Sequence, residues 1–515
     1  MNKNDFVLYG KASVKSAIII VFFIVSIVHK SSSQDFNPKS DTWYFNNFKT
    51  ATLSWDDFRE TFIGIAPTEA ESANFDPLFY DNIYQTRLAS PGNCFGMCLL
   101  ALEMKKNGGC EGYCYPPYLY PGSVGPSQPE LSHAINILHG HQINHTAIMY
   151  MLDIIAQNYQ RDGNYVFSQL QYYLEKDDPC VISVTENWAP GSNGHALIAY
   201  KAVTEGTLRK ILIYDPNRPY PANASTYYDN QQNFVSIAQD GTWSFTMADG
   251  AVWSGSQSTG GNLILFPLSI AGPRDRIPQS LFADISEAVS KILIYGSNVD
   301  VNQISNTKGR HLFKPGTKEL ESDTSKRIKN LLPFVPFSMG HQNGNYKEML
   351  FFYRSNEPLD IDVINSGSGY TLAMIGSKGL VSVKAINGSG SEKIRMENFN
   401  TSVPSVSFIN QSNPSYYQVE LRSIVKENEK VRIYSIDRFN PLANSPVNLT
   451  ISRKGSGIEI FSEKKISQFD LTVSEVIINK IISVKQTAEL EPGKIIKFSV
   501  GKSADRKGLT LDRIK

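Results

Sequence analysis

Three side chains that together could perform nucleophilic catalysis occur in order in the first half of the chain: Cys94, His195 and Asp215. Cys94 follows a turn at residues 91–93 and begins a helical pattern. The free N–H groups and the dipole of a helix N-terminus stabilise negative charge, so a thiol placed there is more readily the reactive thiolate. Gly96 would leave room for a substrate backbone to pass. The pattern predicts that Cys94 is a nucleophile.

The two other residues have the settings that a base and its partner need. His195 lies in the apolar run GHALIAYKAV and is predicted at the start of a strand. Its imidazole can accept the thiol proton and later give a proton to a leaving group. Asp215 ends the next apolar run, and antiparallel pairing would bring its carboxylate beside the ring to orient it. Asn217 is the reserve orienting residue, because an amide can play the same part.

These motifs, taken together, carry a resemblance to a known family. A cysteine at a helix start, GHALIAY and then LIYDPN resemble the papain-like cysteine peptidase superfamily, especially the peptidases of bacteriocin-exporting transporters and related secreted bacterial cysteine proteases. The resemblance covers roughly residues 80–270. It implies a peptidase or amidase that forms a thioester, with Cys94 as nucleophile, His195 as base and Asp215 as orienting acid.

The chain departs from that family at the oxyanion site. The family usually carries a Gln or Asn about five or six residues before the cysteine, where its amide helps to bind the oxyanion. Arg87, Leu88 and Ala89 fill that region here. Gln85 and Asn93 are the two candidate donors, beside a backbone N–H, and the sequence does not choose between them.

Two other functions fit the same chain. A transglutaminase-like acyl transferase would use the same three residues, with an amine in place of water. A non-catalytic surface adhesin or binding protein would use the C-terminal half instead. Enhanced reactivity of Cys94 toward an alkylating agent distinguishes an enzyme from a binding protein.

The remaining cysteines and histidines have more ordinary interpretations. If Cys94 is free, the other four cysteines allow three pairings, and a disulfide bond is expected, for example between Cys110 and Cys114. The histidines of residues 133–145 lack the HExxH pattern of a zinc helix, so they are interpreted as core or solvated side chains. No metal and no cofactor is predicted.

The elements that would position the three residues come as helices first and strands afterwards. Periodicity predicts a helix start near Trp55 and further helices and strands over the following ranges: helices at 94–106, 131–139, 146–158 and 165–175, and strands at 181–185, 195–203, 210–214, 234–238, 242–246 and 262–267. The order predicts an α+β papain-like domain with an antiparallel sheet over residues 34–272. Residues 34–80 are a candidate pro-segment or N-terminal extension.

The second half of the chain is patterned for strands. Short alternating runs, such as LDIDVI and VRIYSI, are separated by Gly, Asn, Ser and Pro clusters, which predicts antiparallel β-sandwiches. We expect one sandwich over residues 273–400 and a second, or a continuation of the first, over 401–515. Residues 309–327 are predicted to be a long loop and 502–515 a frayed tail. These β domains would bind a cell-surface or matrix ligand.

The N-terminus and the charge balance suggest where the protein acts and on what. Lysines precede the apolar run at 17–28, and small residues follow it, which predicts a signal peptide over residues 1–33 and a secreted or cell-surface protein. Lys plus Arg number 50 and Asp plus Glu 49, and a net charge of +1 is too small to attract the chain to nucleic acid. The predicted partner is a protein or peptide substrate.

Overall fold

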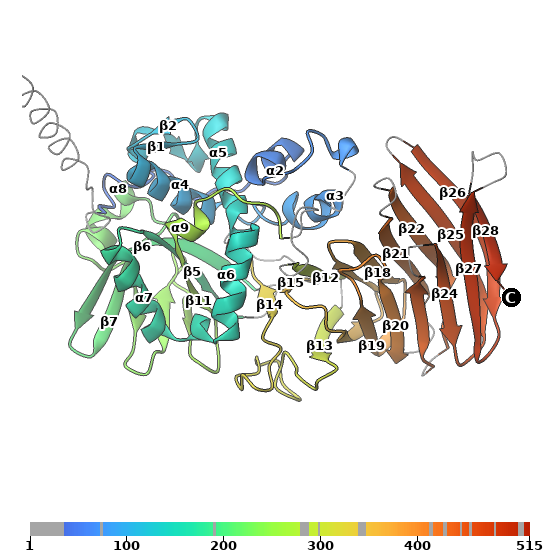
Figure 1. Ribbon diagram of the computed structural model, residues 1–515. Coiled ribbons are helices and arrows are strands. Elements are labelled where there is room, and N and C mark those ends of the chain that lie inside the picture. The colour runs from blue at the N-terminus through green and yellow to red at the C-terminus, as the bar shows by residue number, and fades with distance from the viewer. Residues whose placement is uncertain are drawn as a thin grey trace, which may run out of the picture.

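The protein is made of two lobes that lie side by side, an α+β N-terminal lobe and an all-β C-terminal lobe (Figure 1). The computed structural model describes residues 36–72, 76–188, 192–278, 288–296, 299–337, 347–410, 416–425, 430–442, 445–452, 456–477, 480–502 and 509–514. The predicted signal peptide lies outside the described residues and stays a prediction. Helices followed by an antiparallel sheet, and then by a β-rich half, confirm the coarse fold class.

Capping residues mark several helix ends in the N-terminal lobe. Ser54 and Asp57 form a reciprocal capping box at the start of α2. Gly108 ends α4 in the left-handed conformation, with φ of 76°, which a glycine adopts without strain. The helices are α2 (Trp55–Thr61), α3 (Asp76–Phe79), α4 (Cys94–Asn107), α5 (Pro129–Gly140), α6 (His145–Ala156), α7 (Gly163–Glu175), α8 (Tyr220–Asn223) and α9 (Leu268–Ala271).

A seven-stranded antiparallel sheet forms the base of this lobe. Its order is β10-β9-β8-β7-β6-β5-β11. The strands are β5 (Cys180–Thr185), β6 (Gly194–Glu205), β7 (Leu208–Tyr214), β8 (Phe234–Ile237), β9 (Trp243–Thr246), β10 (Val252–Gly255) and β11 (Leu263–Pro267). Alternate strand residues face two cores: Ile182 and Leu197 pack with α7, whereas Val181 and Ile198 share a core with α4.

Residues 36–72 pack into the core of the N-terminal lobe. Trp43 is fully buried in the core that contains α4, and its Nε1–H donates to the carbonyl of Met97 at 2.8 Å. The hydroxyl of Tyr214 donates to the Trp43 carbonyl at 3.1 Å. The candidate pro-segment therefore contributes core and hydrogen bonds to the elements that hold the predicted site.

The C-terminal lobe is one continuous sandwich of two antiparallel sheets. Its nine-stranded sheet has the order β14-β15-β12-β17-β18-β21-β22-β25-β26, and its eight-stranded sheet β13-β16-β19-β20-β23-β24-β27-β28. Buried residues of both sheets, from Ile292 to Phe498, form a single core, so residues 401–515 continue the sandwich that residues 273–400 begin. Strand β16 shows the predicted alternation of buried and more exposed residues.

The strand bounds agree with most of the predicted runs. The first sheet contains β12 (Ser290–Gly296), β14 (Leu331–Phe334), β15 (Lys347–Tyr353), β17 (Tyr370–Ile375), β18 (Gly379–Ala385), β21 (Tyr417–Val425), β22 (Lys430–Phe439), β25 (Ile466–Ile477) and β26 (Lys480–Leu490). The second contains β13 (Val299–Asn306), β16 (Leu359–Ser366), β19 (Ser389–Glu397), β20 (Ser405–Asn410), β23 (Val447–Ile451), β24 (Gly457–Ser462), β27 (Lys494–Lys502) and β28 (Leu509–Ile514). The predicted loop at 309–327 consists of turns and isolated bridges. The predicted frayed tail is wrong, because β28 pairs with β27.

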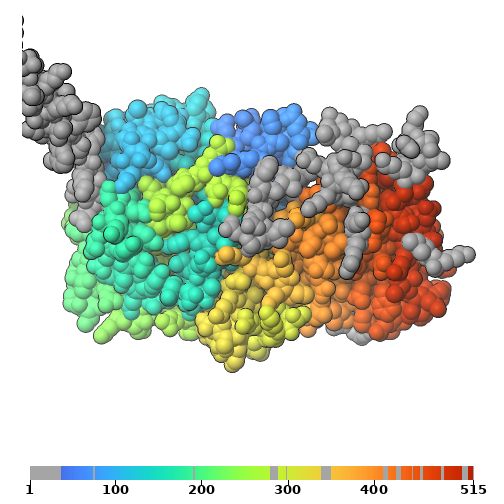
Figure 2. Space-filling view, viewed as in Figure 1, coloured from blue at the N-terminus to red at the C-terminus, as the bar shows by residue number. Residues whose placement is uncertain are grey.

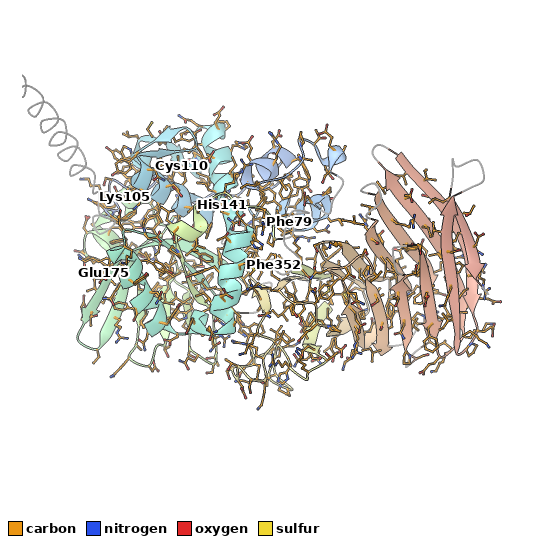
Figure 3. All side chains as sticks on the ribbon, in the orientation of Figure 1. Phe79, Lys105, Cys110, His141, Glu175 and Phe352 are labelled. Atoms are coloured by element: carbon orange, nitrogen blue, oxygen red, sulfur yellow. The ribbon has the colours of Figure 1, made fainter. Side chains whose placement is uncertain are left out.

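The two lobes share hydrophobic core at their junction. Strand β14 follows the long loop of the C-terminal lobe and packs against α6. Leu332, Phe334 and Phe352 belong to the same core cluster as α4. Figure 2 shows the yellow segment that leads to β14 lying against the N-terminal lobe, and Figure 3 places Phe79 and Phe352 near this junction. Among the described residues, no helix combines the length and apolar character needed to cross a membrane.

Candidate active site

Cys94 stands at the first position of α4, against the open edge of strand β6. Strand β7 pairs with β6 only as far as Ile198, opposite Tyr214, so the first residues of β6 have no ladder partner on that side. The backbone N–H of Ala196 is therefore free to donate to the Cys94 sulfur, at 3.3 Å. The Cys94 sulfur therefore lies at a helix start and accepts a backbone hydrogen bond.

His195 and Asp215 form a fully buried pair beside this sulfur. Nε2 of His195 donates to Oδ1 of Asp215 at 2.7 Å, and both side chains are 0% exposed. Burial alone would lower the pKa of His195, but the charges of Asp215 and Cys94 outweigh it and raise that pKa to about 10. Nδ1 has no hydrogen-bond partner among the described residues, which leaves it available to exchange a proton with the thiol.

The Asp215 carboxylate is held in its charged form. Burial would raise its pKa, but His195, the N–H of Asn217 at 2.8 Å and the charge of Arg218 lower that pKa below its ordinary value. Asn217 thus acts through its backbone on the carboxylate, and no hydrogen bond of its side chain to His195 is found among the described residues. The reserve orienting residue is therefore not needed in this arrangement.

Arg218 and Tyr228 fix the turn that carries Asp215. The Arg218 guanidinium donates to the carbonyls of Thr246 and Met247 at 2.9 and 2.7 Å and lies over the ring of Tyr227, 4.4 Å from its centroid. The Tyr228 hydroxyl donates to the Arg218 carbonyl at 2.6 Å. The sequence analysis missed both residues. The one available signal was the position of Arg218, a cation that directly follows the DPN motif.

The two candidate oxyanion amides are engaged elsewhere. The Asn93 amide donates to the hydroxyl of Thr50 at 2.9 Å, and that of Gln85 to the hydroxyl of Tyr80 at 3.2 Å. The first N–H groups of a helix have no intrahelical acceptor, so the backbone N–H of Cys94 is the donor best placed for an oxyanion. Asn93 occupies the N-cap position of α4, but its side chain makes no capping hydrogen bond there.

Gly96 serves packing between helices rather than substrate access. A Cβ atom at Gly96 would stand 2.1 Å from the carbonyl oxygen of Ile135 on α5. The glycine therefore allows α4 and α5 to approach closely, and the expected room for a substrate backbone at this position is wrong.

A segment from the C-terminal lobe covers the sulfur. The Cys94 thiol donates to the carbonyl oxygen of Phe337 at 3.2 Å, across 243 positions of sequence. The Phe337 N–H donates to Oε1 of Gln142 at 2.9 Å, and Gln142 is itself fully buried. The sequence analysis found neither residue, because both lie far from the three motifs along the chain.

The expected disulfide is absent. All five cysteines are described and all are free thiols. Cys110 pairs with Tyr113, and Cys114 with Gly109, in the small hairpin of β1 (Gly109–Cys110) and β2 (Tyr113–Cys114), so the two sulfur-bearing residues are not opposite each other. The three others are buried in the core or at the site.

The histidines of residues 133–145 do not gather into a metal site. His133 bonds to Asp57 at 2.7 Å, whereas His139 accepts from the N–H of Gly96 at 3.4 Å and contacts the Leu88 carbonyl. Nδ1 of His141, labelled in Figure 3, contacts the carbonyl of Ala271 at 3.0 Å. Within the described part of the chain, no group of His, Cys, Asp and Glu side chains is arranged to hold a metal ion.

Comparison with protein-family models, with curated proteins and with solved structures found no match to this chain.

Proposed function

We propose that this chain is a cysteine hydrolase of papain-like type that cleaves a peptide or amide bond. The proposal is carried by one observation: three distant segments bring a helix-start thiol, an N–H donor to its sulfur and a buried His195–Asp215 pair into one cluster. Burying two charges costs several kcal/mol per ion, and a structural pair seldom recovers that cost. A buried pair beside a thiol is therefore better explained by catalysis.

The reaction follows from these positions. In the open site His195 holds the Cys94 proton at Nδ1, as its raised pKa favours, and the Cys94 thiolate attacks the substrate carbonyl carbon, forming a C–S bond. The oxyanion of the tetrahedral intermediate is stabilised by the backbone N–H of Cys94. His195 then protonates the leaving nitrogen as the C–N bond breaks, which leaves a thioester. Water, deprotonated by His195, hydrolyses the thioester and restores the thiol. Asp215 orients the ring and stabilises its cation.

The test compares two buried cysteines on one helix face. Cys98 lies one turn after Cys94, is fully buried and has a pKa raised well above the ordinary value by burial. We expect Cys94→Ala to abolish hydrolysis of fluorogenic peptide amides and Cys98→Ala to retain it. Because Phe337 covers Cys94, each variant is assayed in the natural chain and with Phe337→Ala. Hydrolysis that survives Cys94→Ala in both backgrounds would refute the proposal.

A further inference from the structure

The backbone of Phe337 lies against the Cys94 cluster and is bound there through both of its polar groups. Its carbonyl oxygen is at the Cys94 sulfur, and its N–H is satisfied by a buried amide, that of Gln142. Both polar groups of one peptide-chain residue are thus bound, with the carbonyl directed to the nucleophile. In an acyl donor the carbonyl carbon faces the sulfur and the oxygen faces the oxyanion donor, whereas here the oxygen meets the sulfur, so Phe337 blocks the nucleophile instead of reacting with it.

The side chain of Phe337 fills an aromatic pocket beside the nucleophile. It is 2% exposed and lies against Phe95, with ring centroids 6.3 Å apart and nearly parallel, and against Phe266, at 5.7 Å and edge to face. Because Phe95 directly follows Cys94 in the chain, these aromatic rings lie next to the Cys94 sulfur. Flat aromatic walls at these distances favour an aromatic ring over a small side chain.

Gly194 allows the covering segment to pass close to strand β6. A Cβ atom at Gly194 would stand 2.4 Å from the carbonyl oxygen of Pro336. Because Gly194 directly precedes His195, a side chain there would push the segment away from the cluster. The backbone of Pro336 and Phe337 is therefore in close contact with Gly194, Cys94 and Gln142.

We propose that residues 335–337 are an internal ligand that occupies the acyl side of the substrate cleft. The enzyme accordingly accepts peptides with an aromatic residue at the position joined to the scissile carbonyl, and it is latent until the segment leaves. This inference rests on the proposed hydrolase function. A ligand tethered in the same chain has an effective concentration of the order of mM, so a free peptide of equal affinity does not displace it at a lower concentration.

The first experiment measures access to Cys94. Iodoacetamide is added to the natural chain, to Phe337→Ala and to the control Phe352→Ala, and alkylation of Cys94 is followed by peptide mass spectrometry. Phe352 is equally buried in the same core, where it packs on the Phe334 ring at 5.4 Å. We expect Cys94 to react at least about tenfold faster in Phe337→Ala and unchanged in Phe352→Ala. Gly194→Ala, which removes no core volume, should also speed the reaction.

The second experiment asks what occupies the opened cleft. We expect acetyl-Val-Pro-Phe-amide to slow alkylation of Phe337→Ala and acetyl-Val-Pro-Ala-amide to have little effect. The coumarylamide of the first peptide should be hydrolysed at least about tenfold faster than that of the second. Protection by the Phe peptide without any hydrolysis would support the internal ligand and refute the hydrolase function. Alkylation no faster in Phe337→Ala and Gly194→Ala than in Phe352→Ala would overturn the inference, whatever the hydrolysis assay shows.

Discussion

The charge state of His195 is set by its two neighbours. Asp215 and Cys94 raise the pKa of the ring, and the ring in turn lowers the pKa of Asp215. The raised pKa means that this interaction stabilises the fold fully below the ordinary imidazole value of 6.5 and is lost as pH rises through about 10. The stabilisation that comes from the lowered pKa of Asp215 is present above pH 3.8, the ordinary pKa of an Asp side chain, and is lost as the pH falls below it.

Asp215→Asn removes the charge that holds this arrangement. The pKa of His195 should fall, because burial then acts with less opposition. We expect the alkaline loss of stability to move to lower pH, measured by thermal unfolding between about pH 6 and pH 11. Hydrolysis should fall by roughly 10⁴-fold, because the ring loses its orienting partner. An unchanged pH profile of stability would show that Asp215 does not control the ring.

The three candidate catalytic residues could be picked out from the sequence because the residues around each of them indicate its local structure. A helix start before Cys94, a strand start at His195 and a strand end at Asp215 are all visible within a few residues. Gln142 and Phe337 have no such signal. Phe337 ends the apolar stretch PFVPF, which gives no indication that it returns to a sulfur 243 positions away.

The ends of the strands and helices around the site determine which groups are available there. Strand β7 ends opposite Ile198, which frees the Ala196 N–H for Cys94, and the turn after β7 delivers Asp215. Helix α4 must also lie close to α5 for its N-terminus to reach that strand edge. Gly96 makes this approach sterically allowed.

Gly96→Ala tests the close approach of α4 and α5. The added Cβ meets backbone of α5, which cannot yield as a flexible side chain would. We expect a loss of roughly 1–3 kcal/mol in the free energy of unfolding, measured with urea. Gly108→Asn, at the end of the same helix, is the control, since nothing lies within 4 Å and Asn tolerates the left-handed conformation. Equal effects of the two changes would contradict this role of Gly96.

Helices and strands were predicted correctly where the hydrophobic periodicity and the flanking turn residues agreed. The prediction failed where an element is held by pairing with another strand, which its own residues do not indicate. Helices α4 to α7 and strands such as β16 and β22 follow clear patterns between turn residues. Strand β28 is lysine-flanked and was predicted to fray, yet its partner β27 holds it in the sheet. The expected disulfide failed for a related reason, because strand register at Cys110 and Cys114 is not visible in their spacing.

At the scale of the whole molecule, the two lobes stabilise one another. Arg327, from the loop before β14, is 1% exposed and reaches the C-terminal end of α6. Its guanidinium donates to the carbonyls of Ile155 and Ala156 and to the Asn158 side chain at 2.9 Å. Helix-end carbonyls have no intrahelical donor, so one lobe caps a helix of the other.

Arg327→Met should weaken this junction while keeping its apolar packing. Buried acceptors lose their charged donor, for which we expect a cost on the order of 3 kcal/mol in the free energy of unfolding. The neighbouring Lys326→Ala is the control, because the Lys326 side chain is 64% exposed and its pair with Asp323 is at the surface. Urea unfolding followed by fluorescence measures both. A loss no larger in Arg327→Met than in the control would show that the lobes are held by apolar contacts alone.

The most direct test of the account is the rate at which Cys94 reacts with iodoacetamide at neutral pH, with and without His195. Both chains carry Phe337→Ala so that the reagent has access, and the exposed Cys114 is the reference in the same digest. We predict that Cys94 reacts much faster than Cys114, and that His195→Ala removes the difference. A Cys94 that reacts at the same rate with either residue at position 195 would contradict the account.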